Sequence, residues 1–162
     1  EAPQKEQAAP KAPDVPESGI TYMDAAVEIA SLKDPDNQSD ITVYEWTTLA
    51  AEFEANGIAA TSKYVDETIF LLGIVHHIEP HYFYDWKDID LAKELPTVTF
   101  MEAEYLDYFF CGLHEASQIE KLGEIRKGDI VLIEAKVLHW DKYMGLYADS
   151  CLLGAAWEPP TE

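Results

Sequence analysis

The segment TIFLLGIVHHI, residues 68–78, restricts the possible folds more than any other part of the sequence. On an extended chain its side chains alternate between two faces, and both faces are apolar. One face carries Ile69, Leu71 and Val75, and the other carries Phe70, Leu72, Ile74 and Ile78. A strand of this kind has to be covered on both sides, for instance by the interior of a barrel and by a helix. We therefore expect a mainly β domain with a helix lying over this strand.

Two helical segments precede the strand. Residues 21–32, TYMDAAVEIASL, space their apolar side chains with a helical period and end before the turn-forming stretch DPDNQSD. A longer helix is expected from residue 42 to residue 64, with Asn56 and Gly57 as a weak point near its middle. This long helix is the natural cover for the strand that follows it.

Four further strands and one short helix are expected after residue 78. The strands are predicted at 97–101, 104–113, 129–138 and 143–153, and the helix at 116–125. Three strands, a helix and two more strands form the order of an OB-fold, which is a small Greek-key barrel. The expected fold class is therefore mainly β with N-terminal helices: a five-stranded OB-fold Greek-key barrel covered by the preceding long helix.

Short motifs along the chain support a family resemblance. EANGIAATSKY at 54–64, Gly73, KGDIV at 127–131 and a last strand that ends in Cys151 together resemble the bacterial tRNA_anti-like family of OB-fold domains. The resemblance covers residues 42–153 and implies the fold, but it assigns no activity to particular residues. Family members have a short hairpin after the first strand, whereas this chain has the aromatic insertion HYFYDWKDIDLAKELPTVTF. A shared ligand is therefore not implied.

The resemblance also leads us to expect a disulfide between the two cysteines. In an OB barrel the third and fifth strands run parallel side by side, and Cys111 and Cys151 lie near the ends of these strands. Their matching level and parity let both thiols point outward from neighbouring strands, where a disulfide fits. A disulfide favours an oxidising compartment. Two reduced thiols in the core are the alternative.

Residues 1–19, EAPQKEQAAPKAPDVPESG, contain one large aliphatic side chain and are rich in proline, alanine and glutamate. Such a segment cannot bury enough apolar surface to fold, so we expect a disordered tether. Tethers of this kind commonly follow the cleavage site of an exported protein or the anchor of a lipoprotein. We expect a periplasmic or extracellular protein, either free or held by an upstream lipid anchor. The expected organisation is a tether at 1–19, a short helix and connection at 20–41, the OB-fold domain with its N-terminal helix at 42–157 and a tail at 158–162.

The charge of the chain argues against two classes of partner. Asp and Glu number 31 against 11 Lys and Arg, which gives a formal net charge of −20. Nucleic acids and anionic membrane surfaces bind proteins through Lys and Arg, so both are disfavoured as partners. The acidity also fits solubility alone. The longest apolar runs, such as residues 69–75, are far shorter than the roughly 20 residues that cross a bilayer, so no transmembrane segment is expected.

An aromatic rim is the expected binding surface. In OB-folds the binding face is framed by the loop between the first two strands and the loop between the last two strands. Residues 80–96 and 140–143 are expected to form these loops and to bring six rings together: Tyr82, Phe83, Tyr84, Trp86, Trp140 and Tyr143. Rings at a wet rim are typical of recognition surfaces. The alternative is that the first loop folds over the barrel end as a lid, with its rings serving as core.

A histidine cluster is the candidate metal site. His77, Glu79 and His81 would share one face of a continuous strand and could offer nitrogen and oxygen ligands to zinc or copper. However, Pro80 is expected to break the strand here, and a hydrogen-bonded core histidine is the plainer explanation for His76. The phosphate-loop, nucleophile-elbow and zinc-protease motifs are absent from the sequence.

The sequence therefore predicts a non-enzymatic binding or interaction module of the cell envelope, without a cofactor. It would recognise a protein, peptide or glycan through the aromatic rim. Two alternatives stay open. One is a single-stranded nucleic-acid binder, which the charge disfavours, and the other is a metal-dependent activity at His76, His77 and His81.

Overall fold

The computed structural model describes residues 21–34, 36, 41–85, 88–102 and 107–159. The expected tether at 1–19 therefore lies outside the described residues, as does most of the expected tail at 158–162. The first helix of the described residues is α1, which is capped by Thr21: the Thr21 hydroxyl accepts a hydrogen bond from the N–H of Asp24 (3.0 Å).

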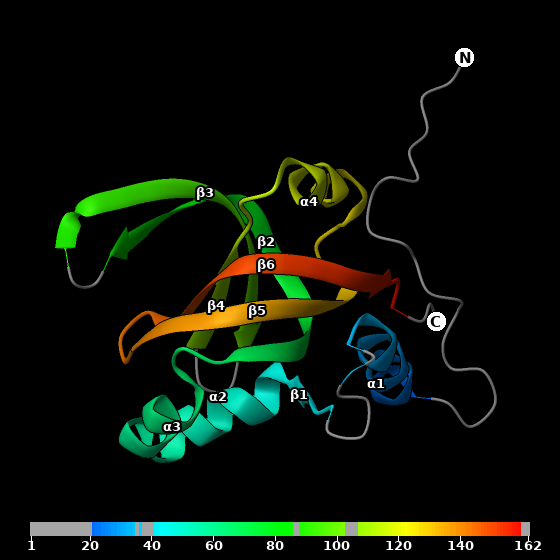
Figure 1. Cartoon of the computed structure of the whole chain (residues 1–162), viewed down its shortest axis with the longest axis horizontal. Helices are drawn as coiled ribbons and strands as arrows, with labels where there is room; N and C mark the ends of the chain where they lie inside the picture. Colours follow the sequence, from blue (N-terminus) through cyan, green and yellow to red (C-terminus); the bar gives the residue numbers. More distant parts are fainter. Residues whose placement is uncertain (1–20, 35, 37–40, 86–87, 103–106, 160–162) are drawn as a thin grey trace.

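Helices come first along the chain and strands follow (Figure 1). The first part holds α1 (Tyr22–Lys33), β1 (Val43–Glu45), α2 (Trp46–Ala55) and α3 (Gly57–Tyr64). The second part holds β2 (Thr68–Asp85), β3 (Asp88–Glu102), β4 (Asp107–Gly112), α4 (Ala116–Lys121), the short 3-10 helix η3 (Leu122–Glu124), β5 (Ile130–Asp141) and β6 (Gly145–Trp157). The expected order of three strands, a helix and two strands from residue 68 onward is confirmed.

The single helix expected over residues 42–64 is wrong in two respects. Its first residues form β1, which pairs in parallel with β2 and places Val43 opposite Phe70. The remainder is divided at Asn56, whose side-chain Oδ1 accepts a hydrogen bond from the N–H of Ala59 (3.1 Å) and so caps α3. Asparagine followed by glycine favours this division because both residues are better at a helix end than inside a helix.

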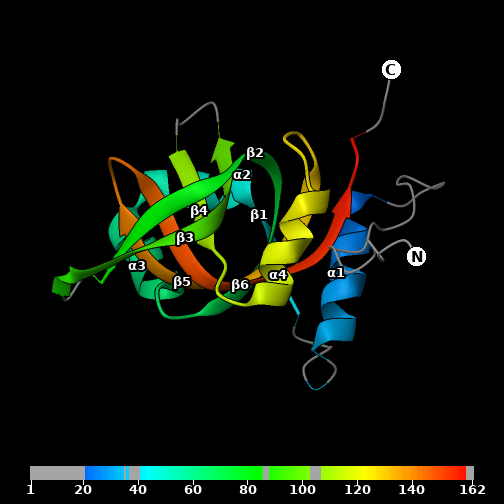
Figure 2. The ribbon, with the colours of Figure 1, turned by 90° about the horizontal axis from the view of Figure 1, so that it is seen from above.

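The strands form a six-stranded mixed sheet in which five strands make a near-ring. The strand order is β1-β2-β3-β4-β6-β5, and β5 pairs again with β2. The first part of β2 pairs antiparallel with β5, and its later part pairs antiparallel with β3. β4 and β6 run parallel, as expected for the third and fifth strands. The strands curve around one interior, with α4 at one end and α2 and α3 at the other (Figures 1 and 2).

The strand at 68–78 is covered on both faces, as predicted, except at Ile74, which is 60% exposed. Its inner face contributes Ile69, Leu71 and Val75 to the main core. Its outer face is covered by α1, because Phe70 and Leu72 pack in a second cluster that includes Ala26, Ala30 and Trp157. The expected cover, the long helix, instead closes one end of the near-ring through Trp46, Phe53 and Tyr64. The outer cover is therefore the short first helix.

Residues 80–96 are not the loop that we expected. Residues 80–85 and 88–96 belong to a long hairpin of β2 and β3, which projects beyond the near-ring (Figure 1). Pro80 does not break β2, because it lies opposite Pro96 in the ladder. The carbonyl oxygen of Pro96 accepts a hydrogen bond from the N–H of Leu113 (2.9 Å), so the polar backbone atoms of Pro96 face β4 and not β2. The pair therefore needs no N–H from either proline.

The predicted disulfide between Cys111 and Cys151 is present, with a distance of 6.0 Å between the two Cα atoms. It does not point outward, because the two residues are 0% and 1% exposed and belong to the main core. Cys111 shares the inner face of β4 with Phe109. In β6, Ser150 has a left-handed backbone (φ 55°), which interrupts the alternation of side chains and turns Cys151 inward.

In the part of the chain that the structure describes, none of the helices has the length and apolar character required to cross a membrane.

Candidate binding surfaces

Two of the six predicted rim residues are exposed rings. Tyr82 on β2 is 57% exposed, and Tyr143 in the β5–β6 turn is 83% exposed, next to Met144 at 44%. The turn is fixed by Asp141, whose Oδ1 accepts hydrogen bonds from the N–H groups of Tyr143 (2.8 Å) and Met144 (3.3 Å). The hairpin and this turn project from the same side of the molecule in both views (Figures 1 and 2). We call Tyr82, Tyr143 and Met144 the tip surface.

Two other rim residues are packed inside. Phe83 is 3% exposed, and Trp140 packs against Phe53 with ring centroids 5.5 Å apart. The Trp140 ring also occupies the space that a side chain at residue 57 would need, so only glycine fits at Gly57. Phe83 therefore acts as core, which was the alternative for the rings of the first loop, and the half-buried Trp140 packs against the main core. The side chain of Tyr84 and all of Trp86 lie outside the described residues.

A second group of rings lies on the outer faces of β4 and β6, and sequence reasoning missed it. Phe110 of β4 is opposite Tyr147 of β6, and their rings stack at 4.8 Å between centroids. Tyr108 extends the row by stacking on Phe110 at 5.6 Å. We call these rings, together with His81 and Phe83, the outer aromatic cluster. The available signal was the position of Phe110, which is one residue from Cys111 and therefore lies on the opposite face of its strand.

His81 is held within the outer aromatic cluster. Its ring lies nearly parallel to that of Phe110, with 4.3 Å between centroids and 8° between planes. Its Nε2 is 3.4 Å from the hydroxyl oxygen of Tyr147. Burial lowers the pKa of His81 below the ordinary 6.5, against an opposing effect of the Glu79 carboxylate. The folded protein therefore favours the neutral imidazole.

This gives a pH-dependence with a definite sign. The unfolded chain binds a proton at His81 near pH 6.5, whereas the folded chain binds it only at lower pH. The free energy of unfolding is thus expected to fall as the pH drops from 6.5 to the folded-state pKa. His76 and His139, whose pKa values burial also lowers, add to the same loss. Urea unfolding of wild type and His81→Phe at pH 7.5 and pH 5.5 should show the smaller loss in the variant. Equal losses would contradict the assignment.

The histidines do not gather into a metal site. Among the described residues there is no group of three or more His, Cys, Asp or Glu side chains placed to hold a metal ion. His77, Glu79 and His81 share one face of β2, but His81 is engaged by Phe110 and Tyr147. His76 packs against His77 at 4.2 Å and against Tyr108 at 5.8 Å. Burial first, and then the charges of His77 and Lys127, lower the pKa of His76.

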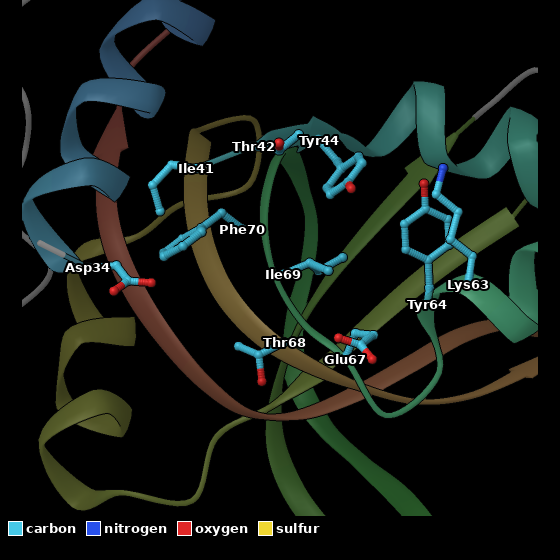
Figure 3. A pocket seen from close by; sticks show the side chains of 10 residues that line it. All are labelled: Asp34, Ile41, Thr42, Tyr44, Lys63, Tyr64, Glu67, Thr68, Ile69 and Phe70. Atoms are coloured by element: carbon cyan, nitrogen blue, oxygen red, sulfur yellow. The ribbon is translucent and has the colours of Figure 1, made fainter. Parts of the chain in front are cut away.

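A groove of about 370 Å³ lies between α1, β1 and α3 (Figure 3). It is lined by Asp34, Ile41, Thr42, Tyr44, Lys63, Tyr64, Glu67, Thr68, Ile69 and Phe70. The Tyr64 hydroxyl donates a hydrogen bond to Glu52 (2.7 Å), and the Lys63 ammonium is 3.2 Å from the same carboxylate. Burial raises the pKa of Tyr64 to about 12, so this hydroxyl stays protonated. The polar groups of Lys63 and Tyr64 on this side of the groove are thus bound to Glu52. No nucleophile–base pair is formed among the lining residues.

Comparisons with known proteins bear on the fold. No protein-family model and no curated protein matches the sequence. A candidate nucleic acid-binding lipoprotein from Klebsiella pneumoniae has a similar structure, with a TM-score of 0.54 and 14% identity over 73% of this chain and 95% of the lipoprotein. The chain has an OB-like fold. A candidate aspartyl-tRNA synthetase from Leishmania major matches at a TM-score of 0.45 and 12% identity, over 94% of this chain and 24% of the synthetase.

Proposed function

We propose that this chain is a non-enzymatic binding module of the cell envelope, built on an OB barrel, that recognises a protein or peptide through the tip surface. The exposure of Tyr82, Tyr143 and Met144 on two projections from the same side of the molecule carries this proposal. Large amphipathic rings bury much area with few rotamers to fix, and they dominate the binding energy of many interfaces. Their partner would have a basic or neutral surface, since the chain has a net charge of −20.

Export is supported by two observations. The Cys111–Cys151 disulfide is typical of proteins from oxidising compartments. The similar structure from Klebsiella pneumoniae is that of a protein described as a lipoprotein. We propose a periplasmic or extracellular location, with an upstream lipid anchor as one way of holding the chain at a membrane.

The tip surface can be tested without knowledge of the natural partner. Peptides selected from a random phage-displayed library on the wild-type protein are expected to bind Tyr82→Ser/Tyr143→Ser about tenfold or more weakly, at an unchanged melting temperature. Leu32→Ser is the matched control, because Leu32 is 71% exposed but lies on α1. Selected peptides that bind the double variant as well as they bind the wild type would refute the proposal.

A second candidate function is the binding of single-stranded nucleic acid. The description of the Klebsiella pneumoniae protein favours it, and the exposed rings of Tyr82 and Tyr143 are surfaces on which bases can stack. The net charge of −20 opposes it, because it repels phosphates. Fluorescence anisotropy with a labelled oligo-dT strand at low salt separates the two functions. Salt-sensitive binding would favour the second candidate.

A further inference from the structure

We propose that the β2–β3 hairpin is a lid, held over the outer faces of β4 and β6 by His81 and Phe83, whose opening uncovers a platform of stacked rings. The platform consists of Tyr108, Phe110 and Tyr147. The proposal is independent of the tip surface, because it concerns the opposite face of the hairpin and rings that are covered in the closed state.

The rings of the platform stack on one another because of the pairing of their strands. β4 and β6 run parallel, so Phe110 and Tyr147 lie at one level and their rings stack, with 26° between their planes. Tyr108 is two residues before Phe110 on the same face and is tilted from it by 26° as well. Three rings in a row on the outside of a sheet would form an exposed aromatic surface if nothing covered them.

The hairpin covers this surface with its own rings. His81 lies on Phe110 in the parallel geometry given above, and Phe83 meets Tyr147 edge to face at 5.5 Å between centroids. Phe110 and Tyr147 are left only 6% and 5% exposed. The place that His81 takes fits one flat aromatic ring, so an opened platform would accept a ligand that carries such a ring.

A glycine makes the close contact possible. A Cβ atom at Gly112 of β4 would lie 2.7 Å from Leu95 and 3.1 Å from Phe83, both of which belong to the hairpin. Any larger residue at this position would push the hairpin away from β4. The absence of a side chain at residue 112 therefore permits closure.

The hairpin can open without breaking the near-ring. Among the described pairings, β5 follows β2 only as far as Ile74, and β4 follows β3 only to Thr97. Beyond these points the two arms pair with each other, apart from the hydrogen bond that the N–H of Leu113 donates to Pro96, and Pro80 faces Pro96 at the base of the hairpin without a hydrogen bond between them. The buried side chains between the closed lid and the platform form a cluster separate from the main core: Phe83 and Leu95 from the hairpin, and Phe110 and Tyr147 from the platform. Closure thus depends on side-chain contacts that can be lost locally.

The test compares amide hydrogen exchange in the full chain for wild type, His81→Ala/Phe83→Ala and Tyr82→Ala. Tyr82 is the matched control, since it lies between the two lid rings and points away from the platform, at 57% exposed. In the double variant, protection of residues 77–83 is expected to fall by about tenfold or more, while protection of β5 stays within about twofold. Tyr82→Ala should leave both unchanged. Binding of 8-anilinonaphthalene-1-sulfonate, an aromatic probe of exposed apolar surface, should rise several-fold in the double variant only.

Gly112→Ala provides a second route, because it displaces the lid and keeps all of its rings. It is expected to give the same local loss of protection and the same gain in probe binding. Equal loss of protection in the hairpin and in β5, or no loss in either, would overturn the proposal. Failure of both variants to fold would overturn it as well, since the cluster would then be an integral part of the core.

Discussion

Replacing both cysteines, as Cys111→Ala/Cys151→Ala, is expected to lower the free energy of unfolding by about 4 kcal/mol. The disulfide closes a loop with a sequence separation of 40 residues, and the chain-entropy model gives about this value for such a loop. The bond joins β4 to β6, the two strands that pair in parallel over only four residue pairs, Tyr108↔Gly145 to Cys111↔Ala148. Its loss therefore weakens the shortest link in the near-ring.

Urea unfolding of wild type and double variant measures this effect. The buried position of the bond adds a kinetic expectation: a reductant should reach it only when the protein opens, since both cysteines are 1% exposed or less. Native wild type in reductant is therefore the control and should keep its disulfide, as shown by thiol titration after quenching. Titration of two thiols in the unreduced, denatured protein, or equal urea midpoints for the two proteins, would contradict the prediction.

The parts of the fold that sequence could predict are those set by local alternation. The strand at 68–78 is apolar on both faces, and this required two covers, which the structure has. The order of the segments indicated an OB-fold, and the parallel neighbours β4 and β6 followed from that fold. The disulfide partners followed from the same arrangement, although the direction of the bond did not.

The errors have a common physical origin in single backbone positions. Ser150 adopts a left-handed backbone and reverses the face of Cys151, and a register shift after Val75 does the same for Ile78. Pro80 stays inside a strand because it pairs with Pro96 at a position of the ladder where neither residue has to donate an N–H. None of these features changes the local composition of the sequence. They depend on the partner strand, which a sequence does not show.

The exposure of the rim rings was predicted in part for the same reason. Tyr82 and Tyr143 are exposed rings as expected, because they lie near the ends of projecting elements. Trp140 packs against Phe53, and the missing side chain at Gly57 leaves room for its ring. Trp140 is far from both residues in the sequence. The outer aromatic cluster joins β2, β4 and β6, so it exists only once the register of three strands is known.

The largest single-residue effect is expected at Phe100, whose ring lies in the middle of the main core. Phe100 is fully buried and stacks against Phe109 at 5.4 Å between centroids. Phe100→Ala should lower the free energy of unfolding by about 3–5 kcal/mol, through lost burial and the cavity that remains. The ring covers the backbone of Gly73 in β2, where a Cβ atom would fall within 2.7 Å of the ring carbon Cγ. Gly73→Ala is therefore expected to cost about 1–3 kcal/mol by overpacking.

The two changes should not add, because each relieves the other. In Phe100→Ala the space over Gly73 is empty, so the added methyl group of Gly73→Ala meets no ring and fills part of the cavity. We expect the double variant to be more stable than the sum of the single effects by at least about 1 kcal/mol, which a double-mutant cycle of urea unfolding measures. Gly123→Ala is the control, since a Cβ there meets no atom within 4 Å and should leave stability nearly unchanged. Strict additivity would mean that the Phe100 ring does not lie on Gly73. The side chains on the inner face of β2 would then be packed in another way, and the register of β2 against β3 would differ from the one described above.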